Sequence, residues 1–157
     1  MAEDWTTRIN TGVPNPARIY DYFLGGKDNF PADREIAEEV LAIAPVAREV
    51  VEDNRAFLRR AVEALTGEAG IRQFIDLGSG LPTQGNVHEI AQAAAPEARV
   101  VYVDNDPMVV THSRALLAGD NTVAIEGDLR QPDKVLEHPD VRELIDFGRP
   151  VALLLLA

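Results

Sequence analysis

Three aspartates, each at the end of an apolar segment, are the residues of this sequence best placed to do chemistry. Asp76 runs directly into Gly78-Ser-Gly80, where glycine lets the backbone turn tightly and approach a ligand closely. Asp104 ends a second apolar segment, and Asp128 follows a third. Ligands of open α/β sheets bind outside the carboxyl ends of the strands, so these carboxylates are expected to share one crevice.

Three classes of ligand are compatible with a glycine-rich turn at this place. A dinucleotide fingerprint needs Gly-x-Gly-x-x-Gly, but Thr83 stands where the third glycine belongs. A Walker loop needs a lysine after its last glycine, and Asn86 occupies that position. Either phosphate ligand would also place a polyanion beside Asp76 without an evident counter-charge.

The third class is S-adenosylmethionine, which carries a sulfonium and an α-amino group but no phosphate. A carboxylate at Asp76 favours those positive groups, and Asp104 can accept both ribose hydroxyls. Asp128 can accept from the adenine amino group while Leu129 packs on the ring. A single aspartate at a strand end is often only a cap or turn residue, so the signal lies in the three together.

The elements that must position these acids alternate from residue 71 onward, which predicts an α/β fold with a parallel sheet and right-handed crossovers. Strands are expected at Ile71–Leu77, Arg99–Asp104, Thr122–Glu126 and Val151–Leu156, and helices at Gln84–Ala95, Pro107–Ala118 and Asp133–Phe147, the last divided near Pro139. The apolar runs in the second and fourth strands are typical of strands covered on both faces.

The first 70 residues have a different character. Residues 1–30 hold most of the aromatic side chains together with prolines and glycines, which predicts an ordered arm with a short helix around Ala17–Leu24. Helices are expected after Pro31, over Ala32–Ile43, and from Pro45 to about Thr66.

Two interpretations of the arm stay open. It is either a hydrophobic clasp on the domain or a lid over the ligand, since aromatic faces, flexible backbone and polar ends are typical of binding loops. In the second case Lys27 or Asn29 meets the carboxylate of the ligand, Tyr20 and Tyr22 line the acceptor side, and Gly26 supplies flexibility. Two interpretations also stay open for four polar residues of the helix expected from Pro45 to about Thr66. They either support the loop after the first strand or form an exposed helix face; the residues are Asn54, Arg55, Arg59 and Arg60.

Composition excludes several classes of function. Lys plus Arg is 15 and Asp plus Glu is 26, a formal net charge of −11 that disfavours bulk nucleic acid and anionic lipid. The absence of cysteine removes disulfides and thiolate chemistry, and the three histidines show no metal-binding spacing, so no metal is expected. No secretory signal or membrane-length apolar run is visible, so we expect a cytoplasmic protein without a membrane partner.

The motifs Phe74-Ile-Asp-Leu-Gly-Ser-Gly80, Tyr102-Val-Asp-Asn-Asp-Pro107 and Glu126-Gly-Asp128 resemble the first three motifs of class I S-adenosylmethionine-dependent methyltransferases. The chain is more closely similar to an actinobacterial family of such enzymes, formerly catalogued as a domain of unknown function. The stretches that carry this likeness are Asn15-Pro-Ala-Arg-Ile-Tyr-Asp-Tyr-Phe-Leu-Gly-Gly-Lys-Asp-Asn-Phe30, Asn54-Arg-Ala-Phe-Leu-Arg-Arg60, Asp76-Leu-Gly-Ser-Gly-Leu-Pro-Thr83 and Asp104-Asn-Asp-Pro107.

The resemblance implies a Rossmann-like, doubly wound parallel sheet of which four of seven strands are present. It divides one structural domain into an N-terminal helical arm at 1–70, covering the site, and an incomplete cofactor-binding core at 71–157. The residues it implies for cofactor binding are Asp76, Gly78, Ser79, Gly80, Asp104, Asn105, Asp106, Asp128 and Leu129. Pro82 stands where many class I enzymes have a third glycine, which stiffens the turn and removes one N–H donor.

The resemblance implies transfer of a methyl group from S-adenosylmethionine to an acceptor, with a small molecule or protein favoured over nucleic acid. Two alternatives stay open: a non-catalytic cofactor-binding fragment or module, and a nucleotide- or NAD-binding protein. No catalytic residue is assigned. Val151–Ala157 is an apolar run with nothing after it. We therefore expect truncation, with self-association through the exposed last strand and monodisperse behaviour of a longer chain.

Overall fold

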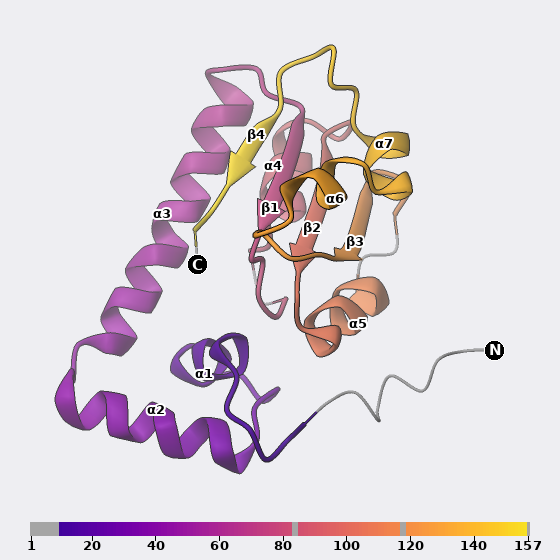
Figure 1. Ribbon diagram of the computed structural model, residues 1–157. Helices are drawn as coiled ribbons and strands as arrows, with labels where there is room; N and C mark the ends of the chain where they lie inside the picture. Colours follow the sequence, from indigo (N-terminus) through magenta and orange to yellow (C-terminus); the bar gives the residue numbers. More distant parts are fainter. Residues whose placement is uncertain (1–9, 83–84, 117–118, 157) are drawn as a thin grey trace.

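Four parallel strands form the centre of the molecule (Figure 1). The computed structural model describes residues 10–82, 85–116 and 119–156. The strands are β1 (Gln73–Leu77), β2 (Arg99–Asp104), β3 (Thr122–Glu126) and β4 (Ala152–Leu154), in the order β3-β2-β1-β4. Because β4 lies on the other side of β1 from β2, the chain reverses direction across the sheet beside β1, and all the strands end at the same edge.

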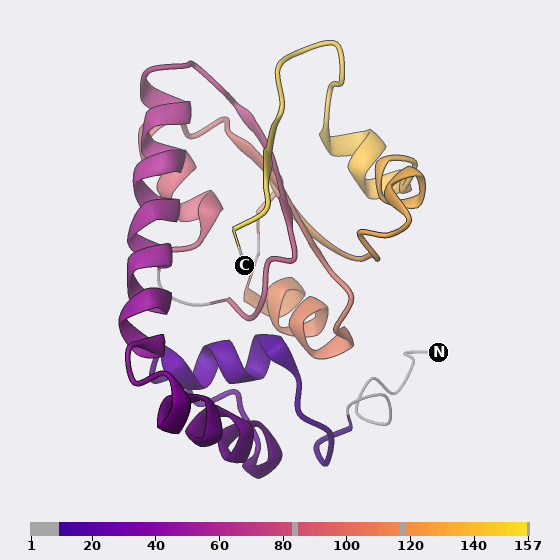
Figure 2. The ribbon, with the colours of Figure 1, turned by 60° about the vertical axis from the view of Figure 1, so that its left-hand side comes forward.

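Helices cover both faces of this sheet (Figure 2), which confirms the doubly wound α/β prediction. On one face α3 (Ala47–Gly67) and α4 (Val87–Ala94) pack over a core that includes Phe74. On the other face α6 (Pro132–Leu136) and α7 (Pro139–Leu144) pack over a core that includes Ile75. The alternation of neighbouring residues between two apolar cores is what a central parallel strand requires.

The remaining helices lie at the carboxyl ends of the strands (Figure 1). They are α1 (Pro16–Phe23), α2 (Pro31–Ile43) and α5 (Pro107–Leu116). Asn15 caps α1 by accepting from the Ala17 N–H at 2.8 Å, and Pro16 occupies the first turn. The arm is therefore ordered against the edge of the sheet where a ligand would bind.

Helix α3 connects the arm to the sheet. Its residues Leu58 and Val62 are buried in the same apolar core as Phe74 of β1. The division into 1–70 and 71–157 stays a prediction, but one of the layers that cover the sheet comes from the first segment.

Most expected elements are confirmed, with shifted ends. Helix α3 begins at Ala47, two residues beyond the expected Pro45, and the division at Pro139 separates α6 from α7. Helix α4 begins at Val87, whereas the start expected at Gln84 lies outside the described residues. No helix in the described part of the chain has the length and apolar character needed to cross a bilayer.

The fourth strand differs most from its prediction. Only Ala152–Leu154 pair with β1, whereas Val151–Leu156 was the expected range. The carbonyl of Leu156 instead accepts from Asn54 Nδ2 at 3.0 Å, which draws this end of the chain to α3. Coverage on both faces is confirmed for β2 and wrong for β4, because Leu153 is 58% and Leu155 63% exposed. Self-association through this edge stays a prediction.

Candidate cofactor site at the strand ends

The turn after β1 is held in an open conformation that favours glycine. Gly78 and Gly80 adopt φ values of 72° and 66°, in the left-handed region that side chains rarely adopt. A Cβ on either would meet no atom within 4 Å, so the requirement is conformational and the space beside the turn is free of protein atoms. The Gly78 N–H donates to the Val103 carbonyl at 2.8 Å, which fixes the turn against β2.

Asp104 joins this turn to the end of β2. One of its carboxylate oxygens accepts from the Gly80 N–H at 2.9 Å and the other from the Asp106 N–H at 2.9 Å. Burial raises the pKa of Asp104, while these backbone donors oppose the shift. Each oxygen keeps further acceptor capacity, so ribose hydroxyls could still bind here.

A cavity of about 310 Å³ opens between the strand ends and the arm. The residues that line it are Asn15, Pro16, Ala17, Tyr20, Arg55, Gly78, Ser79, Gly80, Asp104, Asn105 and Leu156. A volume of this size suits a small-molecule ligand. The first strand's turn, the second strand's end and the arm therefore share one cavity.

A second, more open cavity of about 590 Å³ lies beyond the end of β3 and shares Asn105 with the first. Asp128 lines it, and Arg130 Nη2 donates to Asp128 Oδ2 at 2.7 Å. Hydrogen bonds from Arg130 lower the pKa of Asp128 to about 2, so this carboxylate is ionised at neutral pH. Leu129 is 43% exposed and is not among the lining residues of this cavity.

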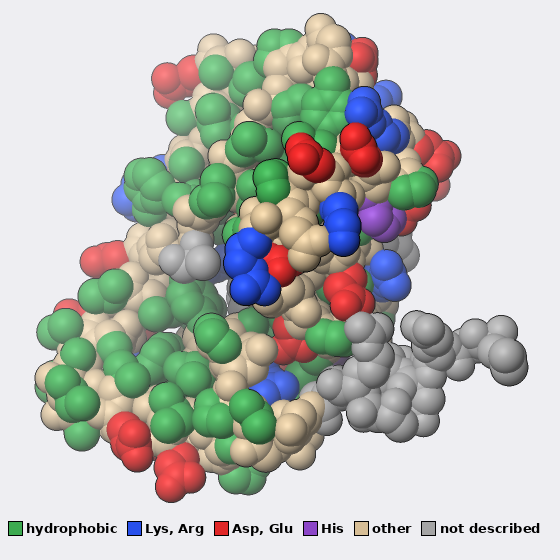
Figure 3. Space-filling view, in the orientation of Figure 1, with side chains coloured by type: hydrophobic (Ala, Val, Ile, Leu, Met, Phe, Trp, Pro, Cys, Tyr) green, Lys and Arg blue, Asp and Glu red, His purple; other side chains and the backbone are tan. Residues whose placement is uncertain are grey.

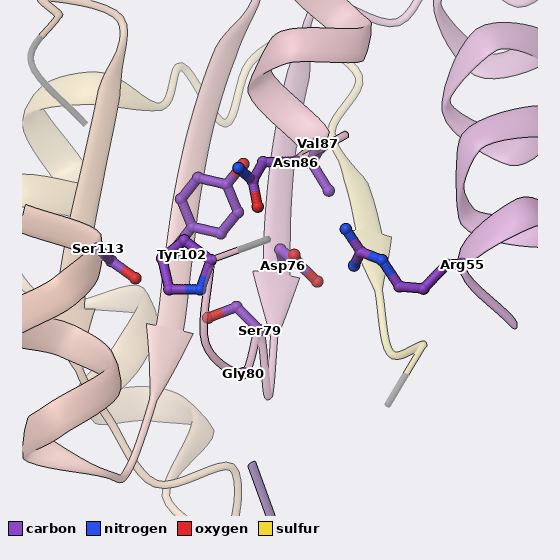
Figure 4. A pocket seen from close by; sticks show the side chains of 9 residues that line it. Arg55, Asp76, Ser79, Gly80, Asn86, Val87, Tyr102 and Ser113 are labelled. Carbon is purple, nitrogen blue, oxygen red and sulfur yellow. The ribbon is translucent and has the colours of Figure 1, made fainter. Parts of the chain in front are cut away.

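A small pocket of about 10 Å³, room for roughly one water molecule, lies beneath the glycine turn (Figure 4). Asp76 and Ser79 line it together with Arg55 and Tyr102. Burial raises the pKa of Asp76 to about 7; the nearby Arg55 charge lowers it and Asp104 raises it further. The Ser79 Oγ is buried and has no hydrogen-bond partner among the described residues. The pocket thus has unused capacity for a positively charged or hydrogen-bonding group.

The arm residues predicted to meet a ligand separate into two groups. Tyr20 lines the cavity, where its hydroxyl accepts from Asn54 Nδ2 at 3.1 Å. Tyr22 instead donates to the carboxylate of Glu38 and lies under the guanidinium of Arg48, 5.1 Å from the ring centre. Tyr22 therefore ties α1 to α2 and α3, and it is not among the cavity's lining residues.

The loop after α1 is organised around a buried aspartate. The Asp21 carboxylate accepts from Asn29 Nδ2 at 2.8 Å and from the Asp28 N–H at 2.9 Å. A Cβ on Gly26 would lie 2.0 Å from Asp21 Oδ1, so glycine is needed for this close approach. Asn29 and Gly26 thus serve the loop itself, and the neighbouring Lys27 is exposed.

Asp106, predicted to flank the ribose, also has a structural role, and its contact with a ligand stays a prediction. Its Oδ1 accepts from the Met108 N–H at 2.8 Å at the start of α5, and Oδ2 lies 4.0 Å from Arg18 Nη1. Arg18, 4% exposed, also pairs with the fully buried Asp33 at 3.0 Å. Neither Arg18 nor Asp33 was among the predicted site residues, because a pairing across 15 residues leaves no local pattern in the sequence.

The open question on α3 is answered separately for each residue. Arg55 Nη2 donates to the Gly85 carbonyl at 3.1 Å and Asn54 holds Leu156, so both support the loops around the cavity. Arg59 is 60% exposed and lies 3.7 Å from Glu63, but a Cβ on Gly85 would lie 3.3 Å from its Nη2, so it also borders that loop. Arg60 is exposed, as expected of a helix surface.

The histidines give no metal centre. His88 Nδ1 lies 2.8 Å from the Tyr102 hydroxyl, and burial lowers the pKa of His88. Within the ranges described above, no three acidic or histidine side chains are grouped closely enough to hold a metal ion.

Charged side chains of both signs surround the strand ends, whereas the surface over α2 and the adjoining part of α3 is mostly apolar (Figure 3). Ile43 at 87% and Val50 at 60% exposure contribute to that apolar surface. Neither Ile43 nor Val50 lines the cavities at the strand ends.

Two solved structures share this fold. A "putative methyltransferase" from Thermobifida fusca YX is 56% identical, with a TM-score of 0.90 over 92% of this chain and 55% of that one. A DUF574 family protein from Streptomyces avermitilis MA-4680 is 49% identical, with a TM-score of 0.88 over 91% of this chain and 56% of that one. This chain therefore spans little more than half the length of either.

No curated protein matches the sequence. A family model described as S-adenosyl methyltransferase matches residues 2–157, nearly the whole chain. The match agrees with the doubly wound sheet, the glycine turn after β1 and the resemblance noted in the motifs. The chain belongs to the S-adenosyl methyltransferase family.

Proposed function

We propose that this chain binds S-adenosylmethionine and is the cofactor-binding part of a methyltransferase. The observation that carries the proposal is the cavity formed where the glycine turn, Asp104 and the arm meet. The family match and the methyltransferase description of the Thermobifida structure support it.

The donor groups around the cavities fit this cofactor. Asp76 and the unpartnered Ser79 Oγ suit an α-ammonium group, and Asp104 suits the ribose hydroxyls. Asn105 belongs to both cavities, so a ligand could extend past it toward Asp128, where an adenine amino group would find an acceptor. When bound, S-adenosylmethionine supplies an electrophilic methyl group; the protein's contribution is position and orientation.

A nucleotide or dinucleotide fits less well. The cavity that meets the glycine turn has the carboxylate of Asp104 at its wall and that of Asp76 in the pocket beneath. A phosphate placed on the turn would lie near both carboxylates, and Arg55 is the one cation among the described lining residues to offset that repulsion.

The acceptor is proposed to be a small molecule or a protein, because the net charge of −11 disfavours nucleic acid. A non-catalytic binding module is the second candidate, since the chain spans only 55% and 56% of the two solved relatives. Transfer measured with the longer relatives alongside this chain would distinguish the two.

Calorimetry tests the binding proposal. S-Adenosylhomocysteine is expected to bind, and NAD and ATP are expected to bind at least tenfold more weakly. Asp104→Asn should weaken S-adenosylhomocysteine by roughly tenfold to a hundredfold, the range for losing hydrogen bonds to a charged group. Asp120→Asn, in an exposed turn, is the matched control and should change nothing. Tight binding of NAD or ATP without S-adenosylhomocysteine would refute the proposal.

A further inference from the structure

An arginine from the covering helix reaches the site that the sequence motifs left without a cation. Arg55 projects from α3, and its Nη2 donates to the Gly85 carbonyl at 3.1 Å. It lines both the 310 Å³ cavity and the small pocket beneath the glycine turn. Of the described residues that line these two spaces, Arg55 is the one that carries a positive charge.

Opposite charge and an unpaired hydroxyl face this arginine. Figure 4 shows the Arg55 guanidinium directed toward the carboxylate of Asp76, with Ser79 beside it at the turn. Asp76 is 8% exposed, and the Ser79 Oγ is buried without a partner. A buried polar atom without a partner costs free energy unless a ligand or water satisfies it.

This arrangement matches the amino-acid end of the proposed ligand, which carries a carboxylate and an ammonium on one carbon atom. The ammonium has Asp76 and Ser79 available. The carboxylate needs a donor, and Pro82 offers no N–H in the turn. Lys27, the residue first considered for this role, is exposed and lies outside the lining of the cavity.

We infer that Arg55 binds the ligand's α-carboxylate, so that Arg55, Asp76 and Ser79 together recognise an amino-acid zwitterion. The inference rests on the proposed function. It assigns the methionine end of the ligand a binding residue on α3, outside the strand-end motifs. Guanidinium is suited to this task, because it binds carboxylates through paired hydrogen bonds that lysine cannot reproduce.

The test compares two ligands that differ only in the carboxylate: S-adenosylhomocysteine and its decarboxylated analogue. The unaltered chain should prefer S-adenosylhomocysteine by roughly tenfold to a hundredfold, the range for a charge-assisted hydrogen bond. Arg55→Gln should reduce that preference to within about twofold, chiefly by weakening S-adenosylhomocysteine, while Arg55→Lys should keep part of it. Arg59→Ala, one turn along α3 and exposed, is the matched control and should keep the full preference.

The outcomes separate this inference from the proposed function. If the unaltered chain binds neither ligand, the proposed function fails and the inference falls with it. If it binds both ligands equally, Arg55 has no carboxylate role, whatever the variants do. If Arg55→Gln weakens both ligands by the same factor, Arg55 acts only through the Gly85 loop and the inference is wrong. The ligand comparison in the unaltered chain can overturn the inference without any variant, and Arg55→Lys, which keeps the positive charge, supplies the second variant if Arg55→Gln fails to fold.

Discussion

The arm and the sheet are stabilised by different kinds of interaction. The sheet's two cores are built from apolar residues, among them Phe74, Ile75, Val101 and Ile125, none of them exposed. The arm has a small apolar cluster, but its centre also holds buried charged groups: Arg18, Asp21 and Asp33 are 4%, 4% and 0% exposed. Apolar burial tolerates many sequences, whereas each buried charge depends on particular partners.

This difference explains why the two regions were predicted with different success. In the sheet segment, the polar residues predicted for the site follow the carboxyl ends of strands, and Asp76, Asp104 and Asp128 do line cavities. Polar residues in the arm looked equally suited to a ligand, but most of them hydrogen-bond to the arm. A polar residue in a compact loop therefore says less about function than one at the end of a parallel strand.

The largest loss of stability is expected at Asp33, because its carboxylate accepts hydrogen bonds from three separate parts of the arm. It accepts from the Asn15 N–H at 2.8 Å, from Arg18 Nε at 3.0 Å and from the Phe30 N–H at 2.8 Å. Asp33→Ala should lower the free energy of unfolding by about 3–5 kcal/mol, the usual cost of breaking a buried pair. Urea denaturation measures it.

The control for Asp33 is Glu63→Ala, which removes an exposed ion-pair partner and should cost less than about 1 kcal/mol. If Asp33→Ala costs no more than this control, the arm is not stabilised by its buried charges and the contrast with the sheet disappears.

A smaller effect, of opposite sign, is expected at Asp76. The pKa of Asp76 is raised to about 7 from an ordinary value of 3.8, so its carboxyl group binds a proton more tightly in the folded state than in the unfolded chain. The unaltered protein should therefore lose stability as the pH rises from about 4 to 7. Asp76→Asn should remove that loss and be more stable at pH 8 by a few kcal/mol.

Asp76→Asn should also weaken the binding of S-adenosylhomocysteine, because the ligand's ammonium group would no longer have the Asp76 carboxylate to pair with. Thermal unfolding at pH 4 and pH 8, together with titration at pH 8, checks both effects. A variant that is less stable than the parent at pH 8 would show that Asp76 stabilises the fold instead of serving the ligand.

Gly26 tests the close packing of the arm loop. Gly26→Ala should cost about 1–3 kcal/mol of unfolding free energy, because the new methyl group would collide with the carboxylate of Asp21. Gly67→Ala is the control: its Cβ would meet no atom within 4 Å and its φ is ordinary, so stability should hold or rise slightly. Equal chemical denaturation midpoints for the two variants would contradict the packing argument.

The smallest effect is expected at Lys27. This exposed residue lies outside the lining of the cavity, so Lys27→Ala should change stability by less than about 0.5 kcal/mol and leave S-adenosylhomocysteine affinity unchanged. Calorimetry beside Arg55→Gln gives the comparison. If Lys27→Ala instead lowered the affinity for S-adenosylhomocysteine tenfold, Lys27 would be a ligand-binding residue, and the assignment of the carboxylate to Arg55 would be weakened.

The sequence alone predicted much of the fold because its signals are local. The alternation of strands and helices after residue 71, the Gly78-Ser-Gly80 turn and the start of a helix at Pro107 each depend on neighbouring residues. Element ends were less well predicted: β4 pairs only over Ala152–Leu154, and the carbonyl of Leu156 beyond it accepts from Asn54 on α3.

Within the candidate site, Asp76, Gly78, Gly80, Asp104 and Asn105 lie together as the motif positions implied, because parallel strands bring their carboxyl ends to one edge. Their contacts with a ligand stay predictions. Asn29 and Tyr22 are not among the residues that line the cavities, and both hydrogen-bond within the protein. Asp106 caps α5 beside the cavity-lining Asn105, and its role toward a ligand also stays a prediction.

The sequence by itself determined the parallel sheet and the acids at its edge, because alternating strands and helices require parallel strands, whose carboxyl ends share one edge. Only the tertiary structure decided which distant side chains meet that edge. Arg55 enters the site because α3 packs across the face of β1, and Arg18 leaves solvent because Asp33 and Asp106 surround it. Such pairings depend on how helices pack against the sheet, and no local pattern in the chain encodes them.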